Sequence, residues 1–551
     1  MTSTNQMTAA QLLVKCLEHE GVEYIFGIPG EENIAVMDAL LDSPIEFIIT
    51  RHEQAAAFMA DVYGRLTGRA GVCMSTLGPG ATNLVTGVAD GNMDRAPMVA
   101  IAGQGATTRM HKESHQVLDL VNLFDPISKY SIQIREPEIV PEIVRKAFKF
   151  AQAEKPGAAF IDFPENIADM PVDNAQPLRV QQPQAPCAPV GKCRQVAEII
   201  DKAKNPVIIA GNGVVRFNAS EELVSFAEEI NAPVATTFMA KGSIPSSHPL
   251  SIGTVGLKAR DLVAFGLEKA DVIICVGYDM VEYPPSYWNP NCDKKIIHID
   301  GSPAEVDTHY IVEAGVIGDI TDTMRRIGAR SQRQSGPAMR ELTKKIRAEF
   351  AEFSEDTAHP VKPQKIIWDI RQVLAPEDIV ISDVGAHKMW MARMFQAERP
   401  NTCIISNGFA SMGIALPGAI AAKLVYPERN ILAVCGDSGF MMNNQEIETA
   451  VRLGLNITVI IFNDNKYGLI EWHQLRHYGR KSHIDVTNPD FVQFAESFGA
   501  HGYKVEKTED LQSILHTAIN DGGVSIIDCP VDYDENMKLT KKLKELTSLQ
   551  V

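Results

Sequence analysis

The sequence predicts an α/β fold made of three doubly wound parallel sheets. Short apolar strands alternate with amphipathic helical segments along most of the chain, the pattern of parallel sheets that are covered on both faces. A chain of 551 residues is also too long for a single core. The alternation is interrupted by residues 171–192, which are rich in Pro, Gln and Ala, and again near His359-Pro360. We therefore expect three α/β domains, at residues 1–175, 190–345 and 360–551.

The first domain shows the alternation most clearly. Thr8 is the expected N-cap of an amphipathic helix over Ala9–Glu20. Strands are then expected at Tyr24–Ile28, Glu46–Thr50 and Gly71–Thr76, and helices at Asn33–Leu41 and Glu53–Leu66; the pattern fades after Phe160–Pro164.

The other two domains repeat the pattern, and the third has the same architecture as the first, although no fixed-period repeat is present. Central strands are expected at Pro206–Ala210, Asp271–Val276 and Lys295–Asp300, followed by a charged helix over Met339–Phe353. In the third domain we expect strands at Asp378–Asp383, Asn430–Cys435 and Ile457–Phe462, with one helix over Asn444–Leu453 between the last two.

The composition narrows the class of protein. The formal charge of −17 disfavours nucleic acid or an anionic membrane as the main partner. Nine cysteines without a Cys-x-x-Cys pair indicate reduced thiols rather than a disulfide framework or a zinc site. The N-terminus resembles no secretory signal, and the chain has no uninterrupted apolar run long enough for a membrane span. We expect a cytoplasmic protein.

Two acidic residues in the third domain give the strongest local signal. Asp437 follows the strand Asn430–Cys435 within Gly436-Asp437-Ser438-Gly439, and Asp464 follows Ile457–Phe462. One intervening helix would place these strands side by side, with both carboxylates at the ligand-binding edge of the sheet. Carboxylates beside glycine N–H groups suit a divalent cation that carries a diphosphate. Each Asp alone is equally consistent with a helix N-cap.

Glu53 is a weaker candidate when it is taken alone. It opens a helix directly after a strand, in Arg51-His52-Glu53, where the helix dipole by itself would favour a carboxylate. The turn Gly78-Pro79-Gly80 is equally consistent with an ordinary βα turn. Isolated histidines, including His387 and His473, indicate no role of their own.

A nicotinamide dehydrogenase is disfavoured by the central domain. Gly211-Asn212-Gly213 follows a strand, but Arg216 occupies the place of the third glycine of the dinucleotide fingerprint. The acidic residue expected further along is not clearly placed.

Together these motifs resemble the thiamine-diphosphate-dependent enzymes of the acetolactate synthase and pyruvate oxidase group. The resemblance covers essentially the whole chain. It rests on Arg51-His52-Glu53, Gly436-Asp437-Ser438 and Asn463-Asp464, and on Phe26–Gly30, Gly78–Asn83, Lys241–Pro245, Ser406–Gly408, Met412-Gly413 and Leu416-Pro417. It implies pyrimidine-binding, central and diphosphate-binding domains, in that order.

The resemblance also implies the site residues. Glu53 would hydrogen-bond the aminopyrimidine of thiamine diphosphate, and Gln116 would lie near the reacting carbon. Asp437, Asp464 and the carbonyl of Lys466 would hold Mg²⁺. The remaining expected cofactor contacts are Pro29, Gly385, Ala386, His387, Ala410, Met412, Gly436, Ser438, Gly439 and Tyr467. Family members complete each site across two subunits, which implies a homodimer or homotetramer.

Two positions depart from the usual family pattern. Ser438 stands where a glycine is usual, and Asp464 stands where an asparagine is usual. A small side chain is tolerable at the first position, and Mg²⁺ can offset the added charge at the second. The affinity of the site for its metal is therefore left open.

Within the group, the chain is most similar to the FAD-free catabolic acetolactate synthases. The segment Gly277–Tyr283, followed by Tyr287–Asn289, differs from the arginine-rich segment of the FAD-containing branch, and His115-Gln116 also matches the catabolic enzymes. Lys241–Gly253 is compatible with both branches. His473 occupies the position of a tryptophan that favours 2-ketobutyrate as acceptor, while Trp472 lies one position earlier. Pyruvate is therefore the expected acceptor.

The expected reaction is the conversion of two pyruvates into 2-acetolactate and CO₂. The alternatives are an FAD-containing biosynthetic acetohydroxyacid synthase catalytic subunit or a pyruvate oxidase, and a non-catalytic family member. Ser438 favours the last alternative, whereas the intact Glu53 argues against it. Simple 2-keto acid decarboxylases are disfavoured because the adjacent His-His pair that many of them carry is absent.

Overall fold

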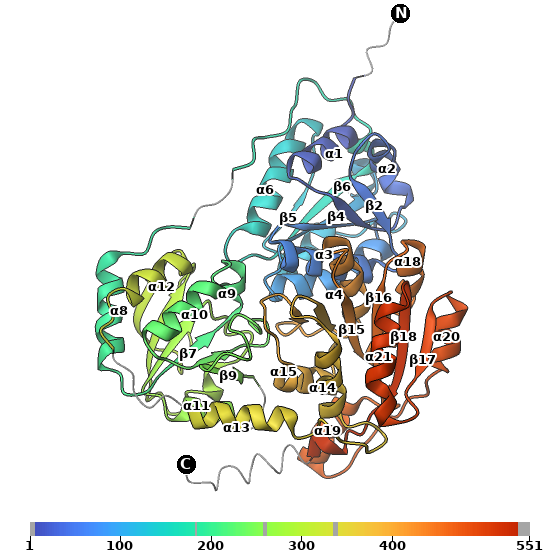
Figure 1. The fold of residues 1–551 in the computed structure, drawn as a ribbon. Coiled ribbons are helices and arrows are strands. Elements are labelled where there is room, and N and C mark those ends of the chain that lie inside the picture. Colours follow the sequence, from blue (N-terminus) through green and yellow to red (C-terminus); the bar gives the residue numbers. More distant parts are fainter. Residues whose placement is uncertain (1–5, 182–184, 257–261, 334–339, 538–551) are drawn as a thin grey trace, which may run out of the picture. The chain divides into compact units, whose positions relative to one another are not determined.

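The computed structural model describes residues 6–181, 185–256, 262–333 and 340–537. Its three six-stranded sheets are entirely parallel and have flanking helices, as expected (Figure 1). The chain forms two compact units. The first contains residues 1–183, 408–427 and 443–455, and the second contains residues 184–407, 428–442 and 456–551. Two expected features lie partly outside the described residues: positions 182–184 of the expected linker and Met339 at the start of the charged helix.

The first sheet belongs to the first unit and has the strand order β2-β1-β3-β4-β6-β5. Its strands are β1 (Tyr24–Gly27), β2 (Glu46–Ile49), β3 (Gly71–Ser75), β4 (Met98–Gln104), β5 (Tyr130–Gln133) and β6 (Ala158–Pro164). Helices α1 (Ala9–His19), α2 (Ile34–Leu40), α6 (Val140–Gln152) and α7 (Glu165–Ala168) share a core with one face of the sheet. The others include α3 (Glu53–Thr67), α4 (Pro79–Met93) and α5 (Leu120–Phe124).

Local sequence signals account for most of these boundaries. The Thr8 side chain accepts the Gln11 N–H at the start of α1, and the Gln11 side chain accepts the Thr8 N–H, which completes a capping box. At the other end of a helix, Gly68 terminates α3 in the left-handed conformation. The three alanines Ala55–Ala57 are fully buried where α3 packs closely on α4, so that a Cβ on Gly87 would overlap Ala57.

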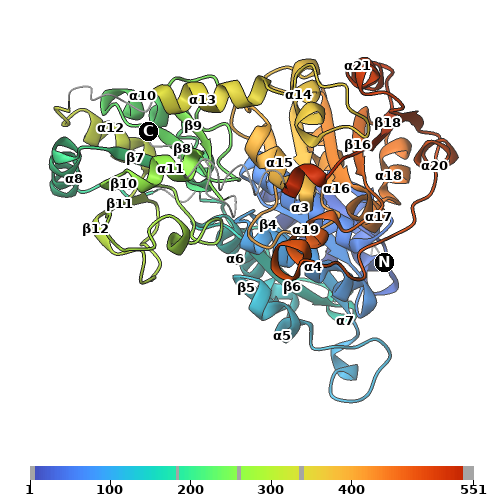
Figure 2. The same cartoon turned by 90° about the horizontal axis from the view of Figure 1, so that it is seen from below.

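The central sheet belongs to the second unit and has the order β12-β11-β10-β7-β8-β9. Its strands are β7 (Pro206–Ala210), β8 (Val234–Thr236), β9 (Ser251–Thr254), β10 (Val272–Val276), β11 (Lys295–Asp300) and β12 (Val312–Ile317). One face packs on α8 (Val190–Lys202), α10 (Ser220–Glu229) and α12 (Ile320–Gly328), and the other on α11 (Leu262–Glu268) and α13 (Arg340–Ala351) (Figure 2). Counted along the chain, this is the 3-2-1-4-5-6 order of dinucleotide-binding sheets.

The third sheet also lies in the second unit, with the order β14-β13-β15-β16-β18-β17. Its strands are β13 (Ile379–Ser382), β14 (Cys403–Ile405), β15 (Ile431–Gly436), β16 (Ile457–Asn463), β17 (His501–Lys504) and β18 (Val524–Pro530). Helices α14 (Pro363–Val373), α15 (Ala386–Met394) and α21 (Leu511–Asn520) contribute to its core. The order repeats that of the first sheet strand for strand, so one architecture is indeed used twice.

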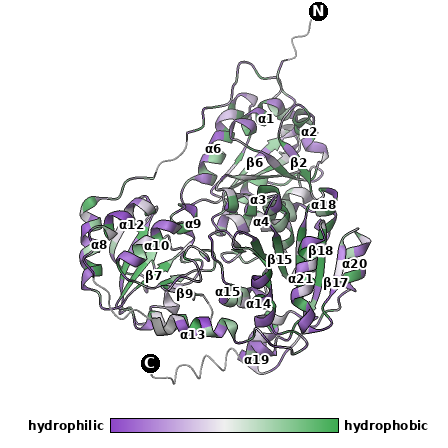
Figure 3. Ribbon diagram, viewed as in Figure 1, coloured by the Kyte–Doolittle hydropathy of each residue, from purple (hydrophilic) through white to green (hydrophobic). Residues whose placement is uncertain are grey.

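Most strands are hydrophobic along their length, whereas the helices mix hydrophilic and hydrophobic residues (Figure 3). The edge strand β17 is an exception, because it contains His501 and Lys504. Two further helices, α16 (Ala415–Val425) and α18 (Glu446–Arg452), belong to the first unit. Within the residues described, we find no helix with the length and apolar character that a membrane crossing requires. All nine cysteines are free thiols, and seven of them are buried.

One local prediction was incomplete. The segment from Asp437 was expected to be a turn, with a single helix beginning at Asn444, whereas the structure has helix α17 over Asp437–Asn443 before α18. Phe440 is 2% exposed and packs edge-on against Phe491, at 5.6 Å between ring centroids. This tertiary contact outweighs the low helix propensity of Gly439.

Candidate active site

Glu53 is the first residue of α3, just beyond the carboxyl end of β2. Its side chain is 8% exposed, and its Oε2 accepts a hydrogen bond of 2.9 Å from Asn83 Nδ2 on α4. The imidazole of His52 caps the helix by accepting the Gln54 N–H at 3.1 Å. The carboxyl group is therefore nearly buried and held by a neighbouring helix.

The glycine turn before α4 brings Gln116 to the same end of the sheet. A Cβ on Gly80 would lie 3.3 Å from Glu53 Oε1, and a Cβ on Gly78 would lie 2.8 Å from the Gln116 carbonyl oxygen. Gln116 is exposed and has a φ of +58°. Pro29 is exposed in the loop that follows β1. The turn is more than a generic connection, because it packs between the two residues expected to be catalytic.

A second carboxylate supports the backbone immediately before Glu53. Glu446 on α18 is fully buried, and its Oε1 accepts the N–H groups of Arg51 at 3.0 Å and His52 at 3.1 Å. Burial raises the pKa of Glu446 to about 7. No local sequence pattern could have indicated this contact, because the partners lie 395 positions apart.

The segment that carries Ala410 and Met412 belongs to the same unit as Glu53. Ala410 has a φ of +61°, and both residues are partly exposed. Asn443 joins this segment to the start of α3, since its Nδ2 donates to the Gly413 carbonyl at 3.0 Å and to Gln54 Oε1 at 3.2 Å. The structure therefore connects the Glu53 helix with the residues expected to contact the aminopyrimidine.

In the second unit, Asp437 and Asp464 follow neighbouring strands. Strands β15 and β16 pair directly, with Gly436 opposite Phe462. Asp437 is 1% exposed; its Oδ1 accepts the Ser438 N–H, and its Oδ2 accepts Asn488 Nδ2, both at 2.7 Å. The two acids therefore meet at the carboxyl edge of the sheet, as the sequence predicts.

Electrostatic effects between the two acids favour a cation at this edge. Burial, and then the negative charge of Asp437, raise the pKa of Asp464 to about 8. Burial also raises the pKa of Asp437. A divalent cation would relieve the repulsion between these carboxylates.

Lys466 pairs with Asp485 in an isolated antiparallel bridge. Tyr467 N donates to the Ile484 carbonyl, and Val486 N donates to the Asn465 carbonyl, both at 2.9 Å. In such an antiparallel bridge, the N–H and carbonyl of Lys466, which lies between Asn465 and Tyr467, point away from the paired segment. The Lys466 N–H bonds Asp464. Its carbonyl therefore faces the same side as that acid.

Glycines surround a buried imidazole where the strand order of the third sheet reverses, between β13 and β15. His387 is 2% exposed, and its Nε2 has no hydrogen-bond partner in the part of the chain that the structure describes. Burial lowers the pKa of His387 to about 3, so the ring is neutral. A Cβ on Gly385 would lie 2.8 Å from the ring, and one on Gly436 would lie 3.2 Å from it. Ala386 is buried, Ser438 is partly exposed, and Tyr467 is 37% exposed.

The donor set fits Mg²⁺ and a diphosphate. Mg²⁺ takes hard oxygen ligands, usually one or two carboxylates together with water and phosphate oxygens. Asp437, Asp464 and a backbone carbonyl match that preference. Among the residues described, no group of three or more His, Cys, Asp or Glu side chains forms a metal cage. Bare glycine backbone at a strand-order switch is also a common setting for phosphate groups.

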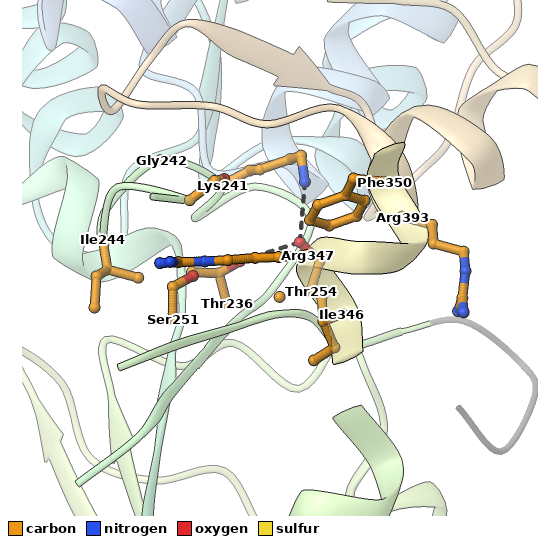
Figure 4. Close-up of a pocket in the computed structure, with 12 residues that line it drawn as sticks. Thr236, Lys241, Gly242, Ile244, Ser251, Thr254, Ile346, Arg347, Phe350 and Arg393 are labelled. Carbon is orange, nitrogen blue, oxygen red and sulfur yellow. Dashed lines mark hydrogen bonds between the residues drawn. The ribbon is translucent and has the colours of Figure 1, made fainter. Parts of the chain in front are cut away.

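Polar and apolar residues of the central domain, together with Arg393 of α15, line a small cavity of about 20 Å³ (Figure 4). Lys241 is 5% exposed, and its Nζ donates to Thr254 Oγ1 at 3.2 Å and to the Ala392 carbonyl at 2.9 Å. Burial lowers the pKa of Lys241 to about 8. A space of this size holds about one water molecule and no cofactor.

The nucleotide crevice of the central sheet is occupied by the protein itself. Gly213 N donates to the Gly277 carbonyl at 2.8 Å, so the loops after β7 and β10 are in backbone contact. The carboxylate of Glu282 accepts the N–H groups of Asn212 and Met239, each at 3.2 Å. A side chain of this chain therefore takes N–H groups near the start of helix α9 (Asn212–Arg216), where a dinucleotide phosphate would bind.

Three family models match the chain in the order in which the sheets occur. Residues 7–123 match the N-terminal TPP binding domain of thiamine pyrophosphate enzymes, residues 193–327 match the central domain, and residues 383–529 match the C-terminal TPP binding domain. The chain belongs to the thiamine pyrophosphate enzymes. Glu53 lies within the first match, and Asp437 and Asp464 lie within the third.

Curated relatives align over almost the full length of this thiamine pyrophosphate enzyme. It is 38% identical to the acetolactate synthase of Bacillus subtilis (strain 168), over 98% of this chain and 96% of the relative. It is 36% identical to the catabolic acetolactate synthase of Raoultella terrigena, over 97% of each chain. The probable acetolactate synthase large subunit of Methanocaldococcus jannaschii is 35% identical, over 98% of this chain and 95% of that protein.

Sequence reasoning missed several residues that support the site. Asn83 holds Glu53, Asn488 holds Asp437, and Glu446 supports the start of α3. Asn83 lies within the Gly78–Asn83 motif, so its position after a strand and a glycine turn was an available signal. The other two act only through tertiary contacts.

Proposed function

We propose that this protein is an acetolactate synthase that binds thiamine diphosphate and Mg²⁺ and converts two pyruvates into 2-acetolactate and CO₂. The observation that carries the proposal is the buried carboxyl of Glu53, which accepts a hydrogen bond from Asn83. The same chain also has Asp437 and Asp464 at the carboxyl edge of the third sheet. Glu53 has no part in phosphate or metal binding, so it distinguishes this site from a general diphosphate site. The names of the relatives supply the reaction.

In the proposed site, Asp437, Asp464 and the Lys466 carbonyl would hold Mg²⁺. Gly385, Ala386, His387, Gly436, Ser438 and Gly439 would surround the diphosphate, while Pro29, Ala410, Met412 and Tyr467 would contact the rest of the cofactor. When bound, thiamine diphosphate supplies the electron sink that decarboxylation of a 2-keto acid requires.

The protein's own residues would orient the reactants and move protons. Glu53 would exchange a proton with the aminopyrimidine, and Asn83 keeps its carboxyl in the position needed. Gln116, which is exposed, would contact the substrate near the reacting carbon. Two pyruvates and one proton give 2-acetolactate and CO₂, so the reaction needs no external oxidant.

The assembly forms part of the proposal. Glu53 and the metal-binding acids lie in different units of the chain. We therefore propose a homodimer or homotetramer in which Glu53 of one subunit completes the site formed by Asp437 and Asp464 of another. The nine free thiols are consistent with a cytoplasmic protein.

An FAD-free enzyme is proposed because Glu282 occupies the nucleotide crevice of the central domain. The flavin-containing relatives, whether biosynthetic synthase or pyruvate oxidase, are not favoured. Trp472 is 8% exposed and belongs to the core of the third sheet, whereas His473 is half-buried. A buried Trp472 supports pyruvate rather than 2-ketobutyrate as acceptor.

A product assay tests this function. The purified protein with pyruvate, Mg²⁺ and thiamine diphosphate should form acetolactate, and formation should stop when either cofactor is omitted. Acetaldehyde or acetyl phosphate as the main product, or a requirement for FAD, would overturn the assignment. Substituting Glu53→Gln should reduce turnover at least ~100-fold, the scale of general acid–base catalysis, with thiamine diphosphate still bound. A fully active variant would eliminate the role of Glu53 and the argument built on it.

A further inference from the structure

Three carboxyl groups are buried together between helices α3 and α4, which flank the first sheet. Asp61 lies on α3, while Asp90 and Asp94 lie on α4 and at its C-cap. All three side chains are completely inaccessible to solvent. Arg65 pairs with Asp94 at 3.3 Å. Buried carboxylates are costly unless they are paired or hydrogen-bonded, so such a cluster needs an explanation.

Two of these carboxyls hold the segment that precedes α16. Gly408 N donates to Asp94 Oδ1 at 2.5 Å, and Ser411 N donates to Asp90 Oδ1 at 3.1 Å. Ala410 lies between these anchors in the left-handed region, with a φ of +61°. Non-glycine residues keep such a backbone only where the surroundings enforce it. The anchored segment is the one that carries the proposed cofactor contacts.

Asp61 is the member of the cluster that the hydrogen bonds leave unexplained. Among the residues that the structure describes, no N–H or O–H group donates a hydrogen bond to either of its oxygens. Burial and the charge of Asp90 raise the pKa of Asp61 well above its ordinary value, while Arg65 acts in the opposite direction and Asp94 adds to the rise. A protonated Asp61 changes from an acceptor to a donor, and Asp90 is the acceptor that it faces.

We infer that Asp61 is a positioning residue, which shares a proton with Asp90 and thereby holds Asp90 where it binds the Ser411 N–H and fixes Ala410 and Met412. The inference rests on the proposed function, because that proposal assigns the cofactor contacts. The shared proton removes one negative charge from the cluster, while Asp90 Oδ1 accepts the Ser411 N–H and anchors the loop. Because Asp61 is completely buried, it would act on the cofactor only through Asp90 and the loop.

The variants that separate this role from simple packing are Asp61→Asn and Asp61→Leu. Asparagine has the shape of a protonated aspartate, and its Nδ2 can donate to Asp90 permanently. Leucine fills a similar volume but has no donor. If only packing matters, both variants should behave alike. If donation to Asp90 matters, asparagine should preserve the loop and leucine should loosen it.

The first measurement is amide hydrogen exchange in the cofactor-free protein. The peptide that spans residues 408–413 should exchange at least ~10-fold faster in Asp61→Leu, the scale expected when one hydrogen bond to a charged group is lost. Exchange in Asp61→Asn should match that of the wild type. Equal protection in all three proteins would overturn the inference. A general increase in exchange across the first sheet would indicate that Asp61→Leu misfolds. The same comparison would then use Asp61→Ser, a smaller residue that can still donate to Asp90, and Asp61→Ala, which cannot.

The second measurement is direct titration with thiamine diphosphate in the presence of Mg²⁺. Asp61→Leu should bind about 10-fold more weakly, whereas its turnover at saturating cofactor should stay within about 3-fold of the wild type. Unchanged affinity together with reduced turnover would contradict a positioning role. A wild-type protein that fails to bind thiamine diphosphate would instead overturn the proposed function, and the exchange result would still test the link between Asp61 and the loop.

Discussion

The buried Glu282 should make the stability of the central domain depend on pH. Burial, with a further contribution from Asp279, raises the pKa of Glu282 from the ordinary 4.5 to about 7. Below pH 4.5 the carboxyl is protonated in both the folded and the unfolded chain, so this group applies no penalty to folding. Between about pH 4.5 and 7 the unfolded chain releases the proton first, so folding loses stability as the pH rises.

The size of this loss follows from the rise in proton affinity. Each tenfold change corresponds to about 1.4 kcal/mol, so the full effect is about 3 kcal/mol at pH values above 7. For a domain of this size, it amounts to roughly 6–12 °C in melting temperature. Glu282→Gln cannot ionise and should lack this component.

Calorimetric melting from pH 5 to pH 8 provides the assay. The melting temperature of the wild type should fall relative to Glu282→Gln as the pH rises, and most of the divergence should occur below pH 7. Taking the difference between the two proteins cancels the contributions of other buried carboxyls. Glu313→Gln, which makes the same chemical change at an exposed position of the central sheet, should follow the wild type. Parallel curves for wild type and Glu282→Gln would refute this account of the buried carboxylate.

Three further outcomes are expected. Relative to Lys241→Met, the wild type should gain about 3 kcal/mol in free energy of unfolding as the pH rises from 8 to 10.5. The reason is that the pKa of Lys241 is lowered to about 8 in the folded chain, so the folded chain releases this proton before the unfolded chain does. Chemical denaturation of the two proteins measures this, and equal pH profiles would contradict it. Gly27→Ala should destabilise the first sheet by about 3 kcal/mol or more, measured by urea unfolding, because a Cβ there would overlap the Met74 carbonyl oxygen. Asp437→Asn should raise the Mg²⁺ concentration for half-maximal activity about 10-fold or more. Asp464→Asn introduces the residue that is usual in the family, so its Mg²⁺ requirement should stay within about 3-fold of that of the wild type. Activity that survives EDTA in all three proteins would contradict a metal role for these residues.

Several elements of the fold were predictable because their causes are local. Thr8 and Gln11 form the capping box that begins α1, and the apolar runs became the strands within a residue or two. A βαβ connection places consecutive parallel strands side by side, so the adjacency of Asp437 and Asp464 also followed from the chain order. Helix α17 was missed because the contact between Phe440 and Phe491 joins segments distant in sequence.

By itself the sequence determined the family, the three parallel sheets and the principal acids of the candidate site. These depend on residue type, on spacing and on the order of strands, all of which can be read along the chain. Only the tertiary structure decided which groups support the site. Asn83 donates a hydrogen bond to Glu53, Glu446 accepts the Arg51 N–H, and Asp90 accepts the Ser411 N–H. It also decided that Glu282 accepts the N–H groups of Asn212 and Met239 in the central domain. Side chains of this kind act through burial and through hydrogen bonds to residues tens or hundreds of positions away, so no local pattern records their role.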